Sequence, residues 1–266
     1  MIDQLIAYGP LLLHGAIFVL LCFILGLWLV SVAMKDSSIV DIFWGPGCAG
    51  VAWVYYFSTS APSPRALLAL SLITLWGARL GLYIGIRNWG AEDRRYARLR
   101  SHITDQGRNY TMYSLRAVFA YQGAAMMLCT LPMLFAIGTP GPIGPIAVLA
   151  AILVCGGLVI ETFADQQMSR FRASRQDPRT VMDQGLWHFS RHPNYFGEML
   201  VQWGLFFLAL DTGPLALLSI VAPLLLSYLI TGPMGASLLE RRLVKKNPDY
   251  GEYVARTSAF IPWWPK

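Results

Sequence analysis

The chain has 266 residues, of which 55% are hydrophobic and only 14% are charged, and its mean hydropathy is +0.48. Soluble domains carry charge on about 25% of their residues, so this composition excludes a soluble or disordered chain and indicates an integral membrane protein. The net charge of +6 does not indicate nucleic-acid binding, because the basic residues flank apolar segments, where membrane topology and anionic lipids account for them.

Seven apolar segments follow one another along the chain. They are Leu11–Met34, Ile39–Phe57, Ala66–Ile86, Met112–Ile137, Ile143–Ala164, Phe196–Leu210 and Pro214–Leu239. Most are long enough for a hydrocarbon core, which takes about 20 residues of helix, and the short sixth segment is expected to extend toward Arg191 or to be shielded by protein. The pattern predicts one all-α membrane domain over residues 1–266, a bundle of seven transmembrane helices.

The distribution of lysine and arginine predicts how this bundle lies in the membrane. Nearly all of them fall in the connections Lys35–Ser38, Arg87–Tyr110 and Asp165–Tyr195 and in the tail Glu240–Lys266. The opposite connections contain only Arg65. The positive-inside rule therefore places the N-terminus outside and the C-terminus in the cytosol, which requires an odd number of helices.

The second and third segments each contain a charged residue at membrane depth. Asp41 lies one turn into the second segment, and a stripe of the third segment consists of Trp76, Arg79, Tyr83 and Arg87, spaced 3, 4 and 4. An arginine at the membrane centre costs about 2.5–3.5 kcal/mol on insertion scales, so Arg79 is expected to face a cavity, a substrate or a carboxylate. Asp41 can pair with Arg79 or, if burial keeps it partly protonated, donate a hydrogen bond to a carbonyl oxygen.

Acidic and basic residues mark the cytosolic end of the fifth segment. Glu161, Asp165 and Arg172 share a helical face, and further arginines nearby are Arg170, Arg175 and Arg179. Carboxylates accept hydrogen bonds from ribose or amide groups, and the fork of an arginine matches the geometry of a phosphate. The alternative is a helix end that lies among lipid headgroups.

The stretch Gly185–Glu198 gathers many polar side chain types at the start of the sixth segment. They are Arg191, His192, Asn194, Tyr195 and Glu198. Pro193 suits the first turn of a helix, and the free N–H groups of such a start can bind an anion. His188 and His192 lie four residues apart, but the chain has four histidines and no HExxH motif, so no metal site is expected.

Three stretches resemble one known family. Gly185-Leu186-Trp187 followed by Ser190-Arg191-His192-Pro193-Asn194-Tyr195-Phe196-Gly197-Glu198 resembles the C-terminal half of the membrane-embedded steroid 5α-reductase superfamily. The tail Asp249-Tyr250, Tyr253 and Thr257-Ser258-Ala259-Phe260-Ile261-Pro262 is similar to the same family. Lys35-Asp36-Ser37-Ser38-Ile39-Val40-Asp41 with Phe43-Trp44-Gly45 resembles its bacterial branch.

The resemblance implies reduction by NADPH of a carbon–carbon double bond conjugated to a ketone, as in a 3-oxo-Δ4-steroid. NADPH would enter from the cytosol and a lipophilic substrate from the lipid of a bacterial inner membrane. Residues 1–137, with helices 1–4, would serve mainly the substrate, and residues 138–266, with helices 5–7 and the tail, mainly the cofactor. Membrane lipids are the other expected partners, and the protein is expected to be a monomer.

The same resemblance implies roles for individual residues. The family pattern suggests a carboxyl–tyrosine pair at the ketone, for which Asp41 supplies the carboxyl; the matching third-helix position is Trp76, so that Tyr83, Tyr55 or Tyr56 would replace the tyrosine. Asn194 and Glu198 would hold the nicotinamide end of NADPH. The remaining cofactor contacts are expected at Arg79, Arg87, Asp165, Arg170, Arg172, Arg179, Arg191, His192, Tyr195, Glu240, Arg241 and Tyr250.

Two other classes of function fit part of the pattern. Isoprenylcysteine and phospholipid methyltransferases have a similar Arg-His-Pro, Tyr, Gly and Glu pattern and use S-adenosylmethionine. That cofactor lacks phosphates and does not need the arginines at 170, 172, 175 and 179. A lipid-binding or scaffold protein would leave Asp41, Arg79 and Glu198 without a purpose, so the sequence favours the reductase.

Overall fold

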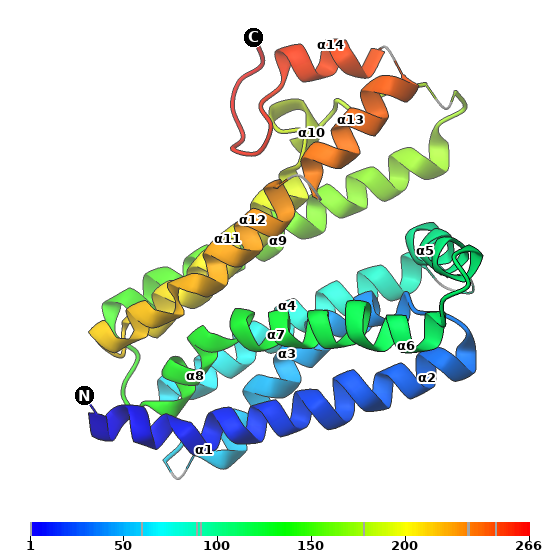
Figure 1. Cartoon of the computed structure of the whole chain (residues 1–266). Coiled ribbons are helices and arrows are strands. Elements are labelled where there is room, and N and C mark those ends of the chain that lie inside the picture. Colours follow the sequence, from blue (N-terminus) through cyan, green and yellow to red (C-terminus); the bar gives the residue numbers. More distant parts are fainter. Residues whose placement is uncertain are drawn as a thin grey trace. The chain divides into compact units, whose positions relative to one another are not determined.

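The computed structural model describes residues 2–59, 61–88, 90, 92–177, 179–232, 235–247 and 249–266, and every regular element in these ranges is a helix (Figure 1). The chain forms two compact units. Unit 1 consists of Met1–Ala147 and Leu208–Ala222, and unit 2 of Val148–Phe207 and Pro223–Lys266. The all-α class that the apolar segments predict is therefore confirmed.

Within the described ranges, four helical stretches are long and apolar enough to cross a membrane. They are Ile6–Met34, Pro64–Arg87, Pro145–Ser174 and Pro214–Thr231, and a fifth forms if Tyr110–Cys129 and Leu131–Gly138, which are bent by 41°, make one span. The protein is thus a multi-pass integral membrane protein. The second and sixth predicted segments also form helices, at Ile39–Ser58 and Pro193–Leu210. The count of seven crossings and their orientation stay predictions.

Unit 1 contains the first part of the chain. Its helices are α1 (Ile2–Phe18), the π-helical η1 (Val19–Gly26), α2 (Leu27–Met34), α3 (Ile39–Ser58), α4 (Pro64–Arg87), α5 (Arg94–Asp105), α6 (Tyr110–Ser114), the π-helical η2 (Leu115–Ala120), α7 (Tyr121–Cys129), α8 (Leu131–Gly138) and the 3₁₀-helical η3 (Pro214–Ile220). Side-chain oxygens of Ser63, Asp93 and Asn109 accept from backbone N–H groups and so cap the starts of α4, α5 and α6.

Helices α3 and α4 approach each other closely because both have glycine at the contact. A Cβ atom on Gly45 would lie 2.8 Å from the Gly77 carbonyl oxygen, and one on Gly77 would lie 2.4 Å from the Gly45 carbonyl oxygen. Small residues permit such close packing between membrane helices, where lipid supplies no hydrophobic driving force. The α3–α4 pair thereby forms the centre of unit 1.

A buried ion pair joins the two chain segments of unit 1. Arg65 Nη1 donates to the carboxylate of Asp211 at 3.2 Å and to its carbonyl oxygen at 3.0 Å, and both side chains are buried. Arg65 Nη2 donates to the Thr139 carbonyl oxygen at 2.9 Å, and the Gly144 N–H donates to Asp211 Oδ2 at 3.0 Å. The start of α4 is thereby connected to the residues before η3.

Unit 2 contains α9 (Pro145–Ser174), α10 (Leu186–Phe189), α11 (Pro193–Leu210), α12 (Val221–Thr231), α13 (Ala236–Lys246) and α14 (Asp249–Arg256), of which α9, α11 and α12 extend across the unit boundary. Glycine again permits a close contact, because a Cβ atom on Gly197 of α11 would lie 2.7 Å from the Gly157 carbonyl oxygen of α9. This contact brings the polar start of α11 to the polar end of α9.

The close approach of Gly45 and Gly77 predicts that a larger residue at position 77 lowers the stability of the protein. Gly77→Ala should destabilise the protein by about 1–3 kcal/mol, because its methyl group would overlap the backbone of α3. Gly85→Ala on the same helix is the matched control, since its Cβ would meet only Ile42 Cγ2 at 3.6 Å. Thermal unfolding in detergent measures both variants, and equal melting temperatures would contradict the role of Gly77.

Candidate functional site

Asp41, at the start of α3, accepts two hydrogen bonds from α5. The Tyr96 hydroxyl donates to Oδ1 at 2.7 Å, and Arg95 Nη2 donates to Oδ2 at 2.8 Å. The Asp41 side chain is only 18% exposed, whereas that of Arg95 is 63% exposed. Arg95 also donates through Nε to Asp93 Oδ1 at 3.0 Å, which joins the first turn of α5 to this cluster.

Tyr96 has a second polar neighbour on α7. Gln122 Nε2 donates to the Tyr96 hydroxyl oxygen at 3.1 Å. Burial raises the pKa of Tyr96, and the negative charge of Asp41 raises it further. The hydroxyl therefore keeps its proton at neutral pH and can serve as a hydrogen-bond donor. The π-helical η2 ends directly before α7, and such stretches are frequent at functional sites.

The four residues predicted to share a face of the third segment lie on α4, but none of them is the tyrosine that bonds to Asp41. Trp76 is 1% exposed and packs edge-to-face on Trp44 with ring centroids 6.0 Å apart. The guanidinium carbons of Arg79 and Arg87 lie 5.3 and 5.5 Å from the centroid of the Tyr83 ring. The tyrosine on Asp41 is Tyr96, which lies 55 residues further along the chain and carries no local sequence signal.

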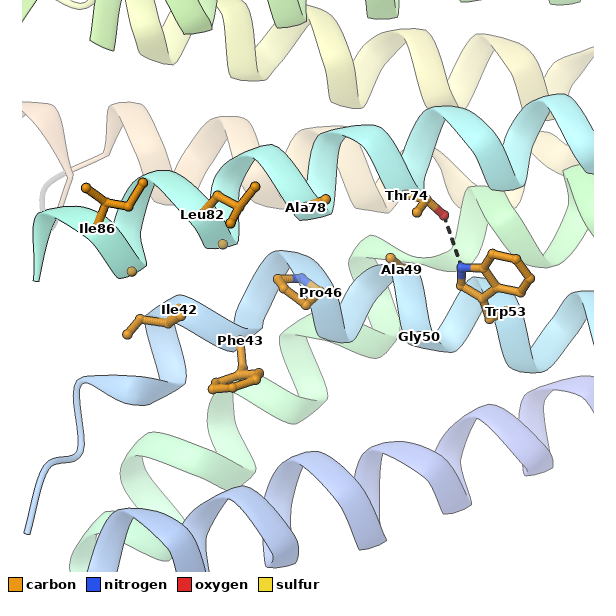
Figure 2. Close-up of a pocket in the computed structure, with 12 residues that line it drawn as sticks. Ile42, Phe43, Pro46, Ala49, Gly50, Trp53, Thr74, Ala78, Leu82 and Ile86 are labelled. Atoms are coloured by element: carbon orange, nitrogen blue, oxygen red, sulfur yellow. Dashed lines mark hydrogen bonds between the residues drawn. The ribbon is translucent and has the colours of Figure 1, made fainter. Parts of the chain in front are cut away.

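An apolar groove of about 640 Å³ lies between α3 and α4 (Figure 2). Its lining is formed by Ile42, Phe43, Pro46, Ala49, Gly50, Trp53, Thr74, Ala78, Gly81, Leu82, Gly85 and Ile86. One end is formed by Ile42 and Ile86, and Ile42 directly follows Asp41. At the other end Trp53 Nε1 donates to Thr74 Oγ1 at 3.1 Å. Binding pockets for drug-sized molecules typically measure about 300–1,000 Å³, so the groove is large enough for a lipophilic ligand.

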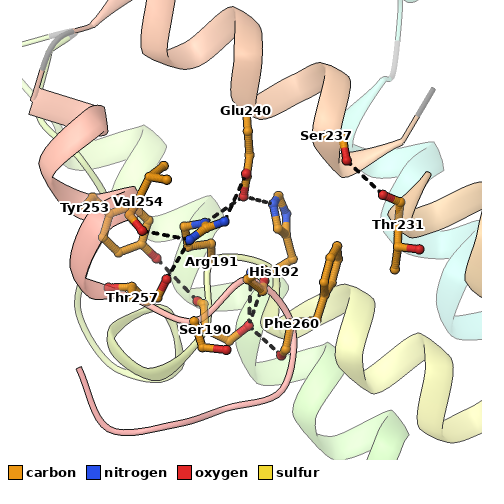
Figure 3. A network of polar contacts seen from close by, with 12 residues as sticks. Ser190, Arg191, His192, Thr231, Ser237, Glu240, Tyr253, Val254, Thr257 and Phe260 are labelled. Carbon is orange, nitrogen blue, oxygen red and sulfur yellow. Dashed lines mark hydrogen bonds and ion pairs between the residues drawn. The ribbon is translucent and has the colours of Figure 1, made fainter. Parts of the chain in front are cut away.

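In unit 2, Arg191 lies at the centre of a second cluster (Figure 3). Its Nε and Nη2 donate to the two carboxylate oxygens of Glu240 at 2.7 and 3.1 Å. Its Nη1 donates to the carbonyl oxygens of Val254 at 2.9 Å and Thr257 at 2.6 Å. These bonds use four of the five N–H donors of a guanidinium group. Arg191 thus binds the C-terminal segment, and one donor is left for the predicted phosphate contact.

His192 adds a contact with Glu240 and two aromatic contacts to the same cluster. His192 Nε2 lies 2.8 Å from Glu240 Oε1, and the imidazole stacks on Tyr195 and Phe260 with centroids 5.3 and 5.4 Å away. Burial of Glu240 opposes its ionisation, but hydrogen bonds from His192 and Arg191 outweigh this and lower its pKa to about 2. Glu240 is therefore a carboxylate at neutral pH.

The C-terminal tail is bonded to the stretch before α11. The Tyr253 hydroxyl donates to the carbonyl oxygen of Trp187, and the Arg191 N–H donates to that of Ser258 at 2.8 Å. Ser190 Oγ donates to the Phe260 carbonyl oxygen at 2.7 Å. Two of the stretches that carry the family resemblance are thus partners in the structure, although the bonded residues lie 66 to 70 positions apart in the sequence (Figure 3).

A row of buried polar side chains lies on α9 and α11. Glu161, Asp165, Glu198 and Gln202 are all buried, with at most 7% of each residue exposed. Asn194 Nδ2 donates to Asp165 Oδ1 at 3.2 Å, and Gln202 Nε2 lies 3.5 Å from Glu198 Oε1. The predicted face of α9 and the start of α11 are therefore adjacent, joined by the Gly157–Gly197 contact.

The other residues expected at the cofactor have varied surroundings. Those exposed are Arg87, Arg170, Arg172, Arg179 and Arg241, whereas Tyr250 is buried and packs on Tyr253 with ring centroids 5.6 Å apart. The exposed arginines are available for an anion. In the part of the chain that the structure describes, no three histidine, cysteine or acidic side chains are placed to hold a metal ion.

The fold and the two clusters define an all-α, multi-pass membrane protein with polar sites at helix ends. The chain belongs to the family described as "Protein of unknown function (DUF1295)", which matches residues 27–257. It is 30% identical over 274 residues to the uncharacterized protein C594.04c of Schizosaccharomyces pombe, covering 91% of this chain and 78% of the yeast protein. No solved structure matches the chain.

The shifted pKa of Glu240 predicts a pH effect on stability. Its pKa falls from 4.5 to about 2 on folding, so its contribution is present above pH 4.5 and is lost as the pH falls toward 2. Glu240→Gln should therefore flatten the decrease of the melting temperature between pH 4.5 and about pH 2, which are the pKa values of Glu240 in the unfolded and folded states. Parallel curves for the variant and the wild type would contradict the assignment.

Proposed function

We propose that this chain is an NADPH-dependent reductase of the conjugated carbon–carbon double bond of a lipophilic enone. The observation that carries the proposal is the 2.7 Å hydrogen bond between Tyr96 and Asp41. It is a carboxyl–tyrosine pair of the kind that the resemblance to steroid 5α-reductases implies at the ketone. The apolar groove that begins at Ile42 supports a lipophilic substrate.

The side chains at this pair suit stabilisation of negative charge on an oxygen. As the double bond is reduced, charge develops on the ketone oxygen, and a donor held in place beforehand stabilises it. Tyr96 would turn its hydroxyl proton from Asp41 to this oxygen while Gln122 continues to donate to the hydroxyl. Arg95, which donates to Asp41 at 2.8 Å, balances the charge of this carboxylate during the exchange.

The residues of unit 2 fit the chemistry of NADPH. Asp165 and Glu198 are buried acceptors for ribose hydroxyl or carboxamide N–H groups, and Asn194 offers both a donor and an acceptor. The exposed Arg170, Arg172 and Arg179 would hold phosphates, while Arg191 would mainly hold the tail in place. When bound, NADPH would supply the hydride to the β-carbon of the enone, and a proton from water would complete the reduction at the α-carbon.

The roles of the two tyrosines can be separated by mutation. In a detergent-solubilised assay that follows NADPH absorbance with a steroidal enone, Tyr96→Phe should lower kcat on the order of 10²–10³-fold, the usual cost of losing one such donor. Its Kd for NADPH should not change. Tyr83→Phe is the matched control and should keep most of its activity. The reverse order would assign the hydroxyl to Tyr83.

A methyltransferase is the second candidate, because buried carboxylates on α9 and α11 also suit the cationic sulfur of S-adenosylmethionine. Calorimetry with each cofactor distinguishes the two functions. NADPH should bind the wild type, and Glu198→Gln should bind it roughly 10-fold more weakly, since a hydrogen bond to a charged group is worth about 1.5–3 kcal/mol. Binding of S-adenosylmethionine without binding of NADPH would overturn the reductase.

A further inference from the structure

The turn between α2 and α3 is held by two residues that the proposed reaction does not use directly. Glu92 Oε1 accepts from the Ser37 N–H at 2.8 Å and from Arg100 Nη2 at 2.7 Å. Arg100 Nε lies 3.3 Å from Glu92 Oε2, so that the guanidinium bridges both carboxylate oxygens. The side chains are 33% and 15% exposed for Arg100 and Glu92.

Arg100 also binds the backbone of the turn. Its Nη2 donates to the Lys35 carbonyl oxygen at 2.9 Å, and its guanidinium carbon lies 4.4 Å from the centroid of the Tyr110 ring. Lys35 has a left-handed conformation, with φ of 56°, and ends α2. The carbonyl groups at a helix end lack partners within the helix, and Arg100 supplies one.

A third contact joins the residues before α5 to the same turn. The Asp93 N–H donates to Ser38 Oγ at 3.1 Å, and Ser38 Oγ donates to Asp36 Oδ1 at 2.6 Å. Ser38 lies three residues before Asp41, and Asp93 lies three residues before Tyr96. The contacts of Glu92, Asp93 and Arg100 therefore hold the start of α5 at a fixed position beside the start of α3.

We propose that Glu92 and Arg100 are positioning residues that hold Tyr96 on Asp41. Exposed ion pairs contribute little to stability, but these two side chains are partly buried and share their hydrogen bonds with the backbone of the turn. Their effect is on geometry, because a catalytic pair requires support that keeps it within about 0.5 Å of its working arrangement. The expected effect on kcat rests on the proposed function. The contact between Glu92, Arg100 and the turn rests on the structure alone.

Kinetics of matched variants test the proposal. Glu92→Ala should lower kcat for the enone by roughly 10- to 100-fold, the scale expected for a displacement of about 1 Å. Glu92→Gln keeps an acceptor for the Ser37 N–H and should lose less. The Kd for NADPH should stay within about twofold of the wild type for both. Asp105→Asn at the end of α5, where Asp105 accepts only from Ser101 Oγ among the described residues, is the control and should leave kcat unchanged.

A double-mutant cycle separates positioning from a general loss of structure. If Glu92 acts through Tyr96, Glu92→Ala should cost little additional kcat in the Tyr96→Phe background, because coupled residues are not additive. An equal loss in both backgrounds would show that Glu92 does not act through Tyr96 and would overturn the proposal.

Hydrogen exchange tests the contact without any activity. Peptides from residues 92–105 should exchange faster in Glu92→Ala and Arg100→Ala than in the wild type, while peptides from residues 186–192 should not change. If exchange over 92–105 stays at the wild-type rate, the contact does not hold α5 and the inference is wrong. If the wild type reduces no enone but exchange responds as expected, the proposed function fails and the contact between α5 and the turn stands.

Discussion

The partly buried carboxylates of this chain need hydrogen-bond donors from the protein, because burial removes the donors that water would supply. Asp41 meets this requirement through Tyr96 and Arg95, and Glu240 meets it through Arg191 and His192. The partners come from short helices and loops beside the long apolar ones. The segments that connect the long helices therefore form part of the polar sites. The long helices position these segments next to one another.

Much of the architecture follows from local features of the sequence. Apolar length and the absence of alternating patterns predict helices, and the glycines of α3, α4, α9 and α11 are where those helices come close. Spacing also predicts the shared face of Glu161 and Asp165 and the row on which Asn194 and Glu198 lie. These relations fall within one helix or between neighbouring segments, so 3.6-residue periodicity is sufficient to find them.

Contacts between distant segments could not be found in the same way. Tyr96 lies on Asp41 where Glu92, Asp93 and Arg100 bond the α5 region to the turn between α2 and α3. No spacing rule predicts such contacts between distant segments. Arg191 illustrates the opposite case. Its position beside a helix start suggests an anion site. In the structure, however, the C-terminal tail brings four acceptor oxygens to its guanidinium group. The path of the tail cannot be predicted from the local sequence pattern.

The buried pair of Arg65 and Asp211 has a consequence for how the protein is made. Unit 1 is discontinuous, since residues 208–222 belong to it and follow most of the chain of unit 2. While the ribosome is still synthesising α9 and α11, Asp211 has not yet been added to the chain, so Arg65 lacks the carboxylate with which it pairs in the folded protein. Unit 1 therefore cannot form this ion pair until synthesis has passed Asp211, so its completion waits for the intervening segment of unit 2.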